Sequence, residues 1–252
     1  MGSNDSSDGG LRHDARPAAR HAIVVADGDV PSRAALDAAW PGWADGVDLV
    51  LAADGGMARA ALAGLAPTVL VGDLDSIDAV TLARAEAAGV SIRRAPVDKD
   101  ESDAELALLE AIRLGATRIT VLGAFGGPRL DHALANVWLL AHPAFAAAEV
   151  ILLDAEARVS LLTAPDVAGV PVTRTLPGRT GALVSLLPFG GEARGITTRG
   201  LRYPLTDEPL AVGPARGLSN VRVGPDAAVT LREGRLLVVE TAPGDGGLSS
   251  DA

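Results

Sequence analysis

The sequence predicts an α/β fold: an N-terminal, mostly parallel sheet with helices on both faces, followed by a smaller all-β, sandwich-like domain. Between residues 21 and 154, short runs rich in valine, isoleucine and leucine alternate with alanine-rich segments of helical length. The runs are almost continuously apolar, as in strands that are buried on both faces. From residue 155 to 242 the helical segments give way to short β-rich segments separated by glycine and proline.

In the first domain, residues 21–154, we expect strands at residues 22–27, 47–54, 68–73, 89–95, 117–124 and 148–154. Helices are expected at residues 33–39, 57–63, 76–88, 102–114 and 131–141. The last helix carries an apolar stripe at helical spacing, formed by Leu134, Val137, Trp138 and Ala141. Strands and helices in regular succession favour right-handed crossovers and a Rossmann-like sheet.

In the second domain, residues 155–242, we expect strands within residues 157–163, 180–189, 193–201, 227–234 and 235–241. The segments at residues 1–20 and 243–252 are polar and rich in small residues. We expect both of them to be disordered tails.

The composition narrows the class of protein. The chain has 252 residues, of which 48% are hydrophobic, so it is long enough for one large core or two smaller ones. Its formal net charge is −10 without a dense basic run, which argues against nucleic acid or an anionic membrane as a partner. Cysteine is absent, and we find neither a signal-peptide pattern nor an apolar span of membrane length. We therefore expect a cytoplasmic protein.

Acidic residues follow the ends of several expected strands. Asp54 follows one strand, Asp73 and Asp75 follow the next, and the run "DKDESD" at residues 98–103 and Asp131 follow two others. Because the carboxyl ends of parallel strands lie at one edge of a sheet, these carboxylates should converge there. Like charges held together repel one another unless a cation lies among them, and an all-oxygen ligand set suits Mg²⁺.

Glycines and one lysine beside these acids indicate a phosphate substrate. The runs "DGG" at residues 54–56 and "GAFGG" at residues 123–127 would let backbone N–H groups approach phosphate oxygens. Lys99 is the only lysine among 22 basic residues, and it lies within the densest acidic run. A flexible ammonium group at this place suits a polyphosphate.

Each of these features also has a purely structural interpretation. Asp73 is in position for an Asx turn, and Ser76 for the N-cap of the helix that follows. Ser102 and Glu105 have the spacing of a capping box. His132 has the alternative role of a hydrogen-bonded structural histidine. Together, however, the features are better explained by a site.

Four runs of the first domain resemble the thiamine pyrophosphokinases (thiamine diphosphokinases) in order and spacing: "AADGGMARA", "PTVLVGDLDSI", "DKDESDAELAL" and "GAFGGPRLDHALAN". In the second domain "RGLRYPL" and "GLSN" are similar to that family's thiamine-side signature, and the resemblance spans residues 21–240. It implies transfer of the β,γ-diphosphoryl group of ATP to the hydroxyl of thiamine, with Mg²⁺, giving thiamine diphosphate and AMP. It also implies a homodimer whose sites are shared between subunits.

The resemblance assigns roles to individual residues. It implies Mg²⁺ binding by Asp73, Asp75 and Asp103, which with Lys99 form the catalytic group; nucleotide and phosphate binding by Asp54, Gly55, Gly56, Ser102, Arg129, Asp131 and Asn136; and thiamine binding by Tyr203, Ser219 and Asn220. Three positions depart from the family pattern. Pro128 is inserted before Arg129, Ser102 replaces a threonine, and Val221 replaces a common acidic residue.

Other functions share part of this pattern. A diphosphokinase that acts on another hydroxyalkyl heterocycle, such as a pterin, would share the carboxylates but lack the "GLRYPL" and "GLSN" segments. A non-catalytic nucleotide-binding module would have lost the metal carboxylates. A sugar-nucleotide transferase with a D-x-D motif would also place a metal beside phosphates, but the rest of the sequence does not support it.

Overall fold

The computed structural model describes residues 20–165 and 168–242. The tails expected at residues 1–20 and 243–252 lie outside the described residues, apart from Arg20. No helix in the described part of the chain is both long enough and apolar enough to span a membrane.

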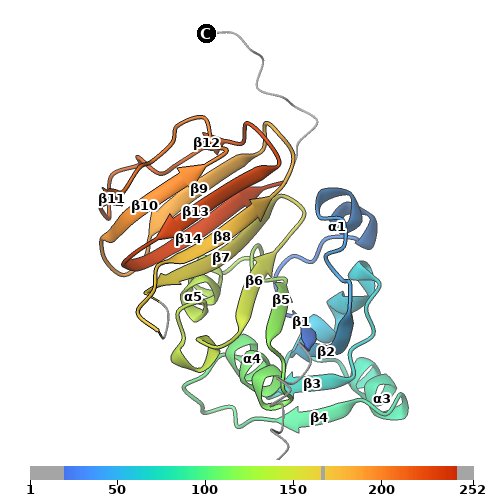
Figure 1. Cartoon of the computed structure of the whole chain (residues 1–252). Coiled ribbons are helices and arrows are strands. Elements are labelled where there is room, and N and C mark those ends of the chain that lie inside the picture. Colours follow the sequence, from blue (N-terminus) through green and yellow to red (C-terminus); the bar gives the residue numbers. More distant parts are fainter. Residues whose placement is uncertain (1–19, 166–167, 243–252) are drawn as a thin grey trace, which may run out of the picture.

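Six parallel strands form the core of the first half of the chain, and the α/β prediction is confirmed (Figure 1). They lie in the order β6-β5-β1-β2-β3-β4. Their bounds are β1 His21–Val25, β2 Val47–Ala53, β3 Val69–Gly72, β4 Ser91–Arg94, β5 Arg118–Leu122 and β6 Glu149–Leu153. The chain runs outward from β1 to β4 and then returns to the other side of β1, so the strand order reverses between β1 and β5.

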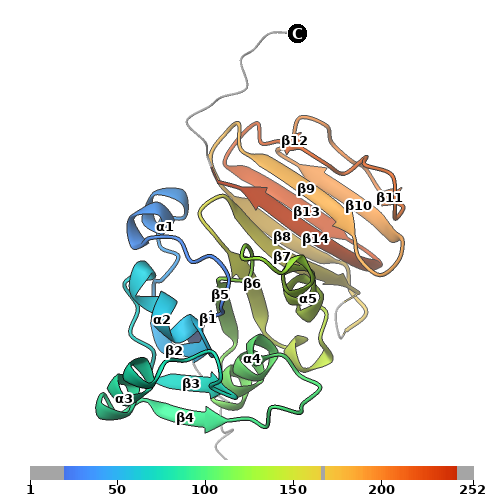
Figure 2. The same cartoon turned by 180° about the vertical axis from the view of Figure 1, so that it is seen from behind.

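Helices cover both faces of this sheet, as Figures 1 and 2 show from opposite sides. One face carries α4 (Asp103–Arg113) and α5 (Leu130–Leu139). The other carries α1 (Arg33–Ala39), α2 (Gly56–Arg59) and the 3₁₀ turn η1 (Ala60–Ala63), whereas α3 (Ala79–Ala87) packs near β3 and β4. A second 3₁₀ turn, η2 (Pro143–Phe145), precedes β6.

The second half of the chain is all β, as expected, but it extends the first sheet as well as adding its own. Four of its strands continue the parallel sheet past β6 in antiparallel pairing, giving ten strands in the order β12-β9-β14-β7-β6-β5-β1-β2-β3-β4. The other four form a separate sheet in the order β11-β10-β13-β8. The bounds are β7 Ala157–Ala164, β8 Val172–Pro177, β9 Leu183–Pro188, β10 Ala193–Arg199, β11 Glu208–Leu210, β12 Asn220–Val221, β13 Asp226–Leu231 and β14 Gly234–Thr241.

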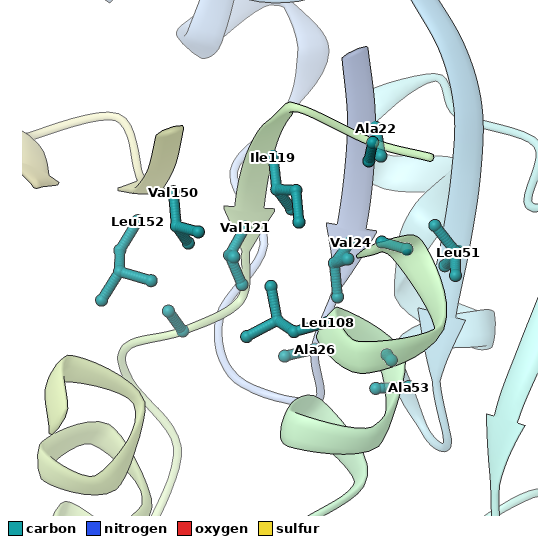
Figure 3. Close-up of a cluster of buried hydrophobic side chains, with 14 of the residues drawn as sticks. Ala22, Val24, Ala26, Leu51, Ala53, Leu108, Ile119, Val121, Val150 and Leu152 are labelled. Atoms are coloured by element: carbon teal, nitrogen blue, oxygen red, sulfur yellow. The ribbon is translucent and has the colours of Figure 1, made fainter. Parts of the chain in front are cut away.

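The core under α4 fixes that helix to the sheet. Leu108 of α4 points toward Ile119 and Val121 of β5 and Val24 of β1 (Figure 3). All four side chains are at most 1% exposed. Burying such aliphatic side chains stabilises the fold by about 1.5–3 kcal/mol each. The start of α4, which carries Ser102 and Asp103, is thereby held beside the ends of the strands.

Two expected helices differ in extent. The helix predicted at residues 76–88 begins only at Ala79, and Asp78 rather than Ser76 is its N-cap. The Asp78 carboxylate accepts hydrogen bonds from the backbone N–H groups of Val80 and Thr81 and so caps the helix. The helix predicted at residues 57–63 is split into α2 and η1, and Gly64 at φ 66° ends it.

The apolar stripe of α5 does not face the core as its spacing suggests. Val137 packs against the core under α4, but Trp138 is 59% exposed and Leu134 47% exposed. Leu130, one turn earlier, is 73% exposed. Trp138 contacts Phe189, the residue directly after β9, edge to face with the ring centres 5.7 Å apart. This helix therefore leaves a large apolar surface open.

We expect Leu108→Ala to lower the free energy of unfolding by about 2–5 kcal/mol, because the side chain is 1% exposed and its removal leaves a cavity between α4 and β5. Leu62→Ala is the matched control, since Leu62 is 56% exposed and its truncation should have little effect. Urea denaturation followed by circular dichroism measures both. Equal losses in the two variants would contradict this description of the core.

Candidate active site

The strand order reverses between β1 and β5, and at such a point open α/β sheets bind ligands in a crevice outside the carboxyl ends of the strands. The loops after these two strands are in direct contact: Gly28 donates its N–H to the Gly123 carbonyl at 2.9 Å. A Cβ atom at Gly28 would lie 2.2 Å from the Phe125 carbonyl oxygen, so glycine is required for this approach. The expected glycine run thus forms one wall of the crevice.

Three carboxylates meet beside this crevice. Asp54 follows β2, Asp73 follows β3, and Asp103 begins α4, and one ligand atom of each lies within 4.8 Å of the others. Asp54 is only 5% exposed, and its Oδ1 has no hydrogen-bond partner. An orphaned buried carboxylate oxygen beside two more carboxylates suits a hard divalent cation such as Mg²⁺.

The backbone is strained where it presents these acids. Asp54 has φ 44° and Leu74, between Asp73 and Asp75, has φ 70°, a region that residues other than glycine rarely adopt. Gly72 provides the space: a Cβ atom there would lie 3.1 Å from Asp103 Oδ1 and from the Asp54 Cβ. The loop geometry therefore allows the approach of the carboxylates, and at the same time it buries Leu74 in a small core with Ala52 and Leu70.

Lys99 is the cation of the cluster. Its Nζ lies 2.8 Å from Asp73 Oδ2 and 3.0 Å from Asp103 Oδ1, and its side chain is 10% exposed. Burial by itself would lower the pKa of Lys99, but the hydrogen bonds to Asp73 and Asp103 outweigh burial and raise it. The Lys99 ammonium in turn lowers the pKa of Asp73. The only lysine of the chain thus balances part of the negative charge.

The charge of Asp54 is left uncompensated. Burial raises the pKa of this carboxyl group, a hydrogen bond from Ser76 opposes the shift, and the nearby charges of Asp103, Asp73 and Asp75 raise the pKa further. A carboxyl group whose pKa is raised on folding opposes folding when it is ionised. A bound cation would relieve this cost.

Asp75 lies outside the group of three. Its Oδ1 accepts a hydrogen bond from the Ser76 hydroxyl at 3.1 Å, and its backbone N–H donates to Asp73 Oδ1 at 3.2 Å. Asp73 therefore makes the Asx turn that its spacing allowed, in addition to its contact with Lys99. A metal role for Asp75 requires its side chain to turn toward the cluster.

Ser102 and Glu105 form half of the expected capping box. The Ser102 hydroxyl accepts a hydrogen bond from the Glu105 N–H at 3.1 Å and caps α4. The Glu105 carboxylate lies 3.5 Å from His142 Nε2 instead of completing the box. The structural interpretation of Ser102 is confirmed, and the cap also fixes the adjacent Asp103 at the start of the helix.

The predicted phosphate residues near α5 separate into two groups. Asn136 donates from Nδ2 to the Ala124 carbonyl at 2.9 Å and so ties the glycine-rich loop to α5. Arg129 and Asp131 are exposed and pair with each other, and the guanidinium lowers the pKa of Asp131 to about 2. The Arg129 guanidinium is thus at the surface beside Pro128 and uses its Nε and Nη2 donors on Asp131.

Two acids that the sequence analysis did not single out lie at the same edge. Asp27 and Asp29 follow β1, and Asp27 Oδ1 accepts a hydrogen bond from Arg59 Nε at 2.8 Å. Asp29 Oδ2 accepts a weak hydrogen bond from the Gly127 N–H at 3.4 Å. The sequence could have indicated them, because they follow the first strand with the same "D-x-D" spacing as the pair after β3. They hold the loops around the crevice.

The predicted thiamine residues form a separate group in the second half of the chain. Asn220 accepts a hydrogen bond at Oδ1 from the Tyr203 N–H at 3.0 Å and donates from Nδ2 to the Tyr203 carbonyl at 2.7 Å. Tyr203 is 64% exposed, and Ser219 has φ 54°. Asn220 therefore holds the backbone of Tyr203 with its ring toward solvent.

This second group lies far from the carboxylates within one chain. Figures 1 and 2 show β11 and β12 on the side of the second half that is turned away from α3 and α4. In the ten-stranded sheet, β12 and β4 are the two opposite edges. The structure therefore brings together Asp54, Lys99, Asp73 and Asp103, and separately Tyr203, Ser219 and Asn220.

Removal of the buried charge should stabilise the metal-free protein. We expect Asp54→Asn to raise Tm by a few degrees in EDTA at neutral pH, and to reduce the rise in Tm that Mg²⁺ produces in the wild-type protein. Asp98→Asn is the control, because it removes the same charge from an exposed position in the neighbouring loop. Thermal unfolding with and without Mg²⁺ measures both effects. A full Mg²⁺ response in Asp54→Asn would exclude Asp54 from the metal site.

The chain matches two family models. Residues 43–152 match "Thiamin pyrophosphokinase, catalytic domain", and residues 173–236 match "Thiamin pyrophosphokinase, vitamin B1 binding domain". The first match includes the three clustered carboxylates and Lys99, and the second includes Tyr203 and Asn220. Together the two matches cover more than half of the chain.

Individual relatives agree with these models. The chain is 25% identical over 200 residues to a thiamine pyrophosphokinase of Bacillus subtilis, covering 79% of this chain and 90% of the relative. It is 28% identical over 161 residues to thiamine pyrophosphokinase 1 of Oryza sativa, covering 62% of this chain and 59% of the relative.

Solved structures share the fold. A thiamin pyrophosphokinase of Geobacillus thermodenitrificans is similar with a TM-score of 0.73 at 26% identity, covering 90% of this chain and all of that chain (100%). The yeast thiamin pyrophosphokinase has the same fold with a TM-score of 0.72 at 15% identity, covering 91% of this chain and 88% of that chain. On the combined evidence of site and comparisons, this chain belongs to the thiamine pyrophosphokinase family of diphosphotransferases.

Proposed function

We propose that this protein transfers the β,γ-diphosphoryl group of ATP to the hydroxyl of thiamine, with Mg²⁺ as cofactor, and so takes part in thiamine diphosphate biosynthesis. One observation carries the proposal: the match to the family's catalytic domain spans the buried cluster of Asp54, Asp73, Asp103 and Lys99 at the carboxyl edge of the sheet. The match to the vitamin B1 binding domain favours thiamine over a pterin. The reaction is placed in the cytoplasm, where ATP is available.

In this proposal Asp73 and Asp103 hold Mg²⁺, with Asp54 beside them and Asp75 turning in from the adjacent turn. The ion would neutralise charge on the transferred phosphates. Lys99, which lies within 3.0 Å of two of these carboxylates, would offer its ammonium group to the phosphate oxygens. The glycine-rich loop held by Asn136 offers backbone N–H groups to the nucleotide.

The two groups of site residues also support a homodimer. Asn220, which binds the Tyr203 backbone, lies in β12 at the edge of the ten-stranded sheet opposite to β4, whereas Asp54 and Asp73 follow β2 and β3. A second copy would therefore bring a thiamine side to each carboxylate cluster. Leu130, Leu134 and Trp138 on α5 are each at least 47% exposed, an apolar surface that a second copy would cover.

The reaction itself is tested with ³¹P NMR on purified protein, ATP, Mg²⁺ and thiamine. We expect AMP and thiamine diphosphate without ADP, because the diphosphoryl group moves as one unit. Asp73→Asn and Asp103→Asn should lower kcat at least about 100-fold, since each removes a charge from the group that holds the cation. The formation of ADP, or near-normal turnover in both variants, would contradict the proposal.

Tyr203→Ala should raise the KM for thiamine much more than the KM for ATP, because an aromatic ring over the cationic thiazolium is lost. Asn220→Ala should have a similar but smaller effect, since it only releases the backbone of Tyr203. Steady-state kinetics with each substrate varied in turn measures both. Equal changes in the two KM values would remove Tyr203 from the thiamine side.

Mixing two impaired variants tests the shared site. If each site joins the carboxylates of one subunit to Tyr203 of the other, mixed dimers of Asp73→Asn and Tyr203→Ala contain one intact site. An equal mixture refolded together should then recover about a quarter of the wild-type rate at low thiamine concentration. No recovery, with mixed dimers present, would place both groups of one site on the same chain.

A further inference from the structure

A cavity of about 320 Å³ lies on the face of the sheet opposite to α4. Its walls come from the end of α1 and the loop after it, from β5 and β6, and from the strands and turns of the second half of the chain. Figures 1 and 2 both show α1 on the side of the first half of the chain that is turned toward the strands of the second half. None of the residues assigned to the carboxylate cluster or to the thiamine side lines this cavity.

The lining is strongly cationic. It contains Arg118, Arg158, Arg179 and Arg222, and the described residues that line the cavity include no aspartate or glutamate. One nearby carboxylate, Glu240, accepts hydrogen bonds from both Arg158 and Arg222. Arg118 and Arg179 form no ion pair with any residue that the structure describes. Two of the four guanidinium groups thus pair with one carboxylate, and the other two form no ion pair within the described part of the chain.

Two of these guanidinium groups have buried donors without partners. The Nε atoms of Arg118 and Arg222 are buried and make no hydrogen bond in the described part of the chain. The Arg222 side chain is only 1% exposed, so solvent does not reach it easily. A buried donor on a charged group is costly when it stays unsatisfied, and such donors usually have a partner. A reorientation of either side chain would bring these donors to the cavity, where an anionic ligand would supply that partner.

The structure keeps room for the Arg222 guanidinium at this place. A Cβ atom at Gly178, which also lines the cavity, would lie 2.2 Å from Arg222 Nη1. The backbone at Gly178 is not in the left-handed region, so its conformation does not require glycine. The space that the missing side chain leaves is therefore used by the guanidinium.

The remaining wall is apolar. Ile151 and Leu153 of β6 and Ala182 before β9 contribute aliphatic surface. The ring of Trp40 lies beside them, and its Nε1 already donates to the Asp154 carbonyl at 2.7 Å. The wall thus offers hydrocarbon contacts but few donors, as is usual for pockets that bind small organic molecules.

We propose that this cavity binds a small organic anion, with its phosphate or carboxylate group on Arg118, Arg179 and Arg222 and its apolar body against Ile151, Leu153 and Trp40. Guanidinium groups match both kinds of anion through paired N–H donors. The volume is at the lower limit of the range typical for ligand pockets, which restricts the ligand to a compact molecule.

The test is isothermal titration calorimetry of the full-length protein with phenyl phosphate and benzoate, and with phenol as a neutral probe. We expect phenyl phosphate or benzoate to bind and phenol not to bind in the same concentration range. Arg118→Gln and Arg179→Gln should each weaken binding at least about tenfold. Arg84→Gln is the matched control, because it removes the same charge from an exposed position on α3 and should leave the affinity unchanged.

Two further variants separate this cavity from the carboxylate cluster. Gly178→Ala keeps every charge but forces the Arg222 guanidinium to move, so it should also weaken binding. Lys99→Gln alters the other site and should leave binding unchanged. The proposal is overturned if neither anion binds at millimolar concentration, if phenol binds equally well, or if Lys99→Gln alone abolishes binding. Because the readout is binding and not turnover, its outcome is independent of the proposed reaction.

Discussion

The parallel pairing of β1 to β6 is the constraint on which the site depends. Parallel strands place all their carboxyl ends at one edge of the sheet, and the loops after β2 and β3 and the start of α4 therefore meet there. Buried side chains such as Leu108 fix α4 to the strands and so fix the position of Asp103. A change in strand order would separate carboxylates that are distant in the sequence.

The cluster at that edge is held against its own electrostatic repulsion. Lys99 compensates Asp73 and Asp103, but Asp54 remains buried with a raised pKa and an unpaired oxygen. The left-handed backbone at Asp54 and Leu74 adds conformational strain in the same loops. Local instability of this kind is typical of sites whose geometry is completed by a ligand rather than by the protein alone.

The two halves of the chain are joined more closely than a pair of separate domains. The pairing of β6 with β7 carries one sheet from the parallel half into the antiparallel half, so the two halves have little freedom to rotate about that boundary. Within the ten-stranded sheet, six strands separate β12, which carries Asn220, from β2, which precedes Asp54. The continuity of the sheet also forms the interior corner in which the arginine-lined cavity lies.

The sequence by itself determined the α/β class, all six parallel strands to within two residues at each end, and the acids that follow them, because apolar runs and their periodicity reflect local burial. It did not determine that Ser76 would lose the helix cap to Asp78, since both residues are plausible caps and only the loop geometry selects one. Strands β11 and β12 were missed because they have only three and two residues, and β8 was missed because half of its six residues, VTRTLP, are polar. All three are held by pairing with strands elsewhere in the chain. Only the tertiary structure decided that Asp54 lies near Asp73 and Asp103 and that Arg118 lies near Arg222, because these residues are far apart in the chain. It also decided that the stripe of α5 is exposed, because that depends on what packs against the helix.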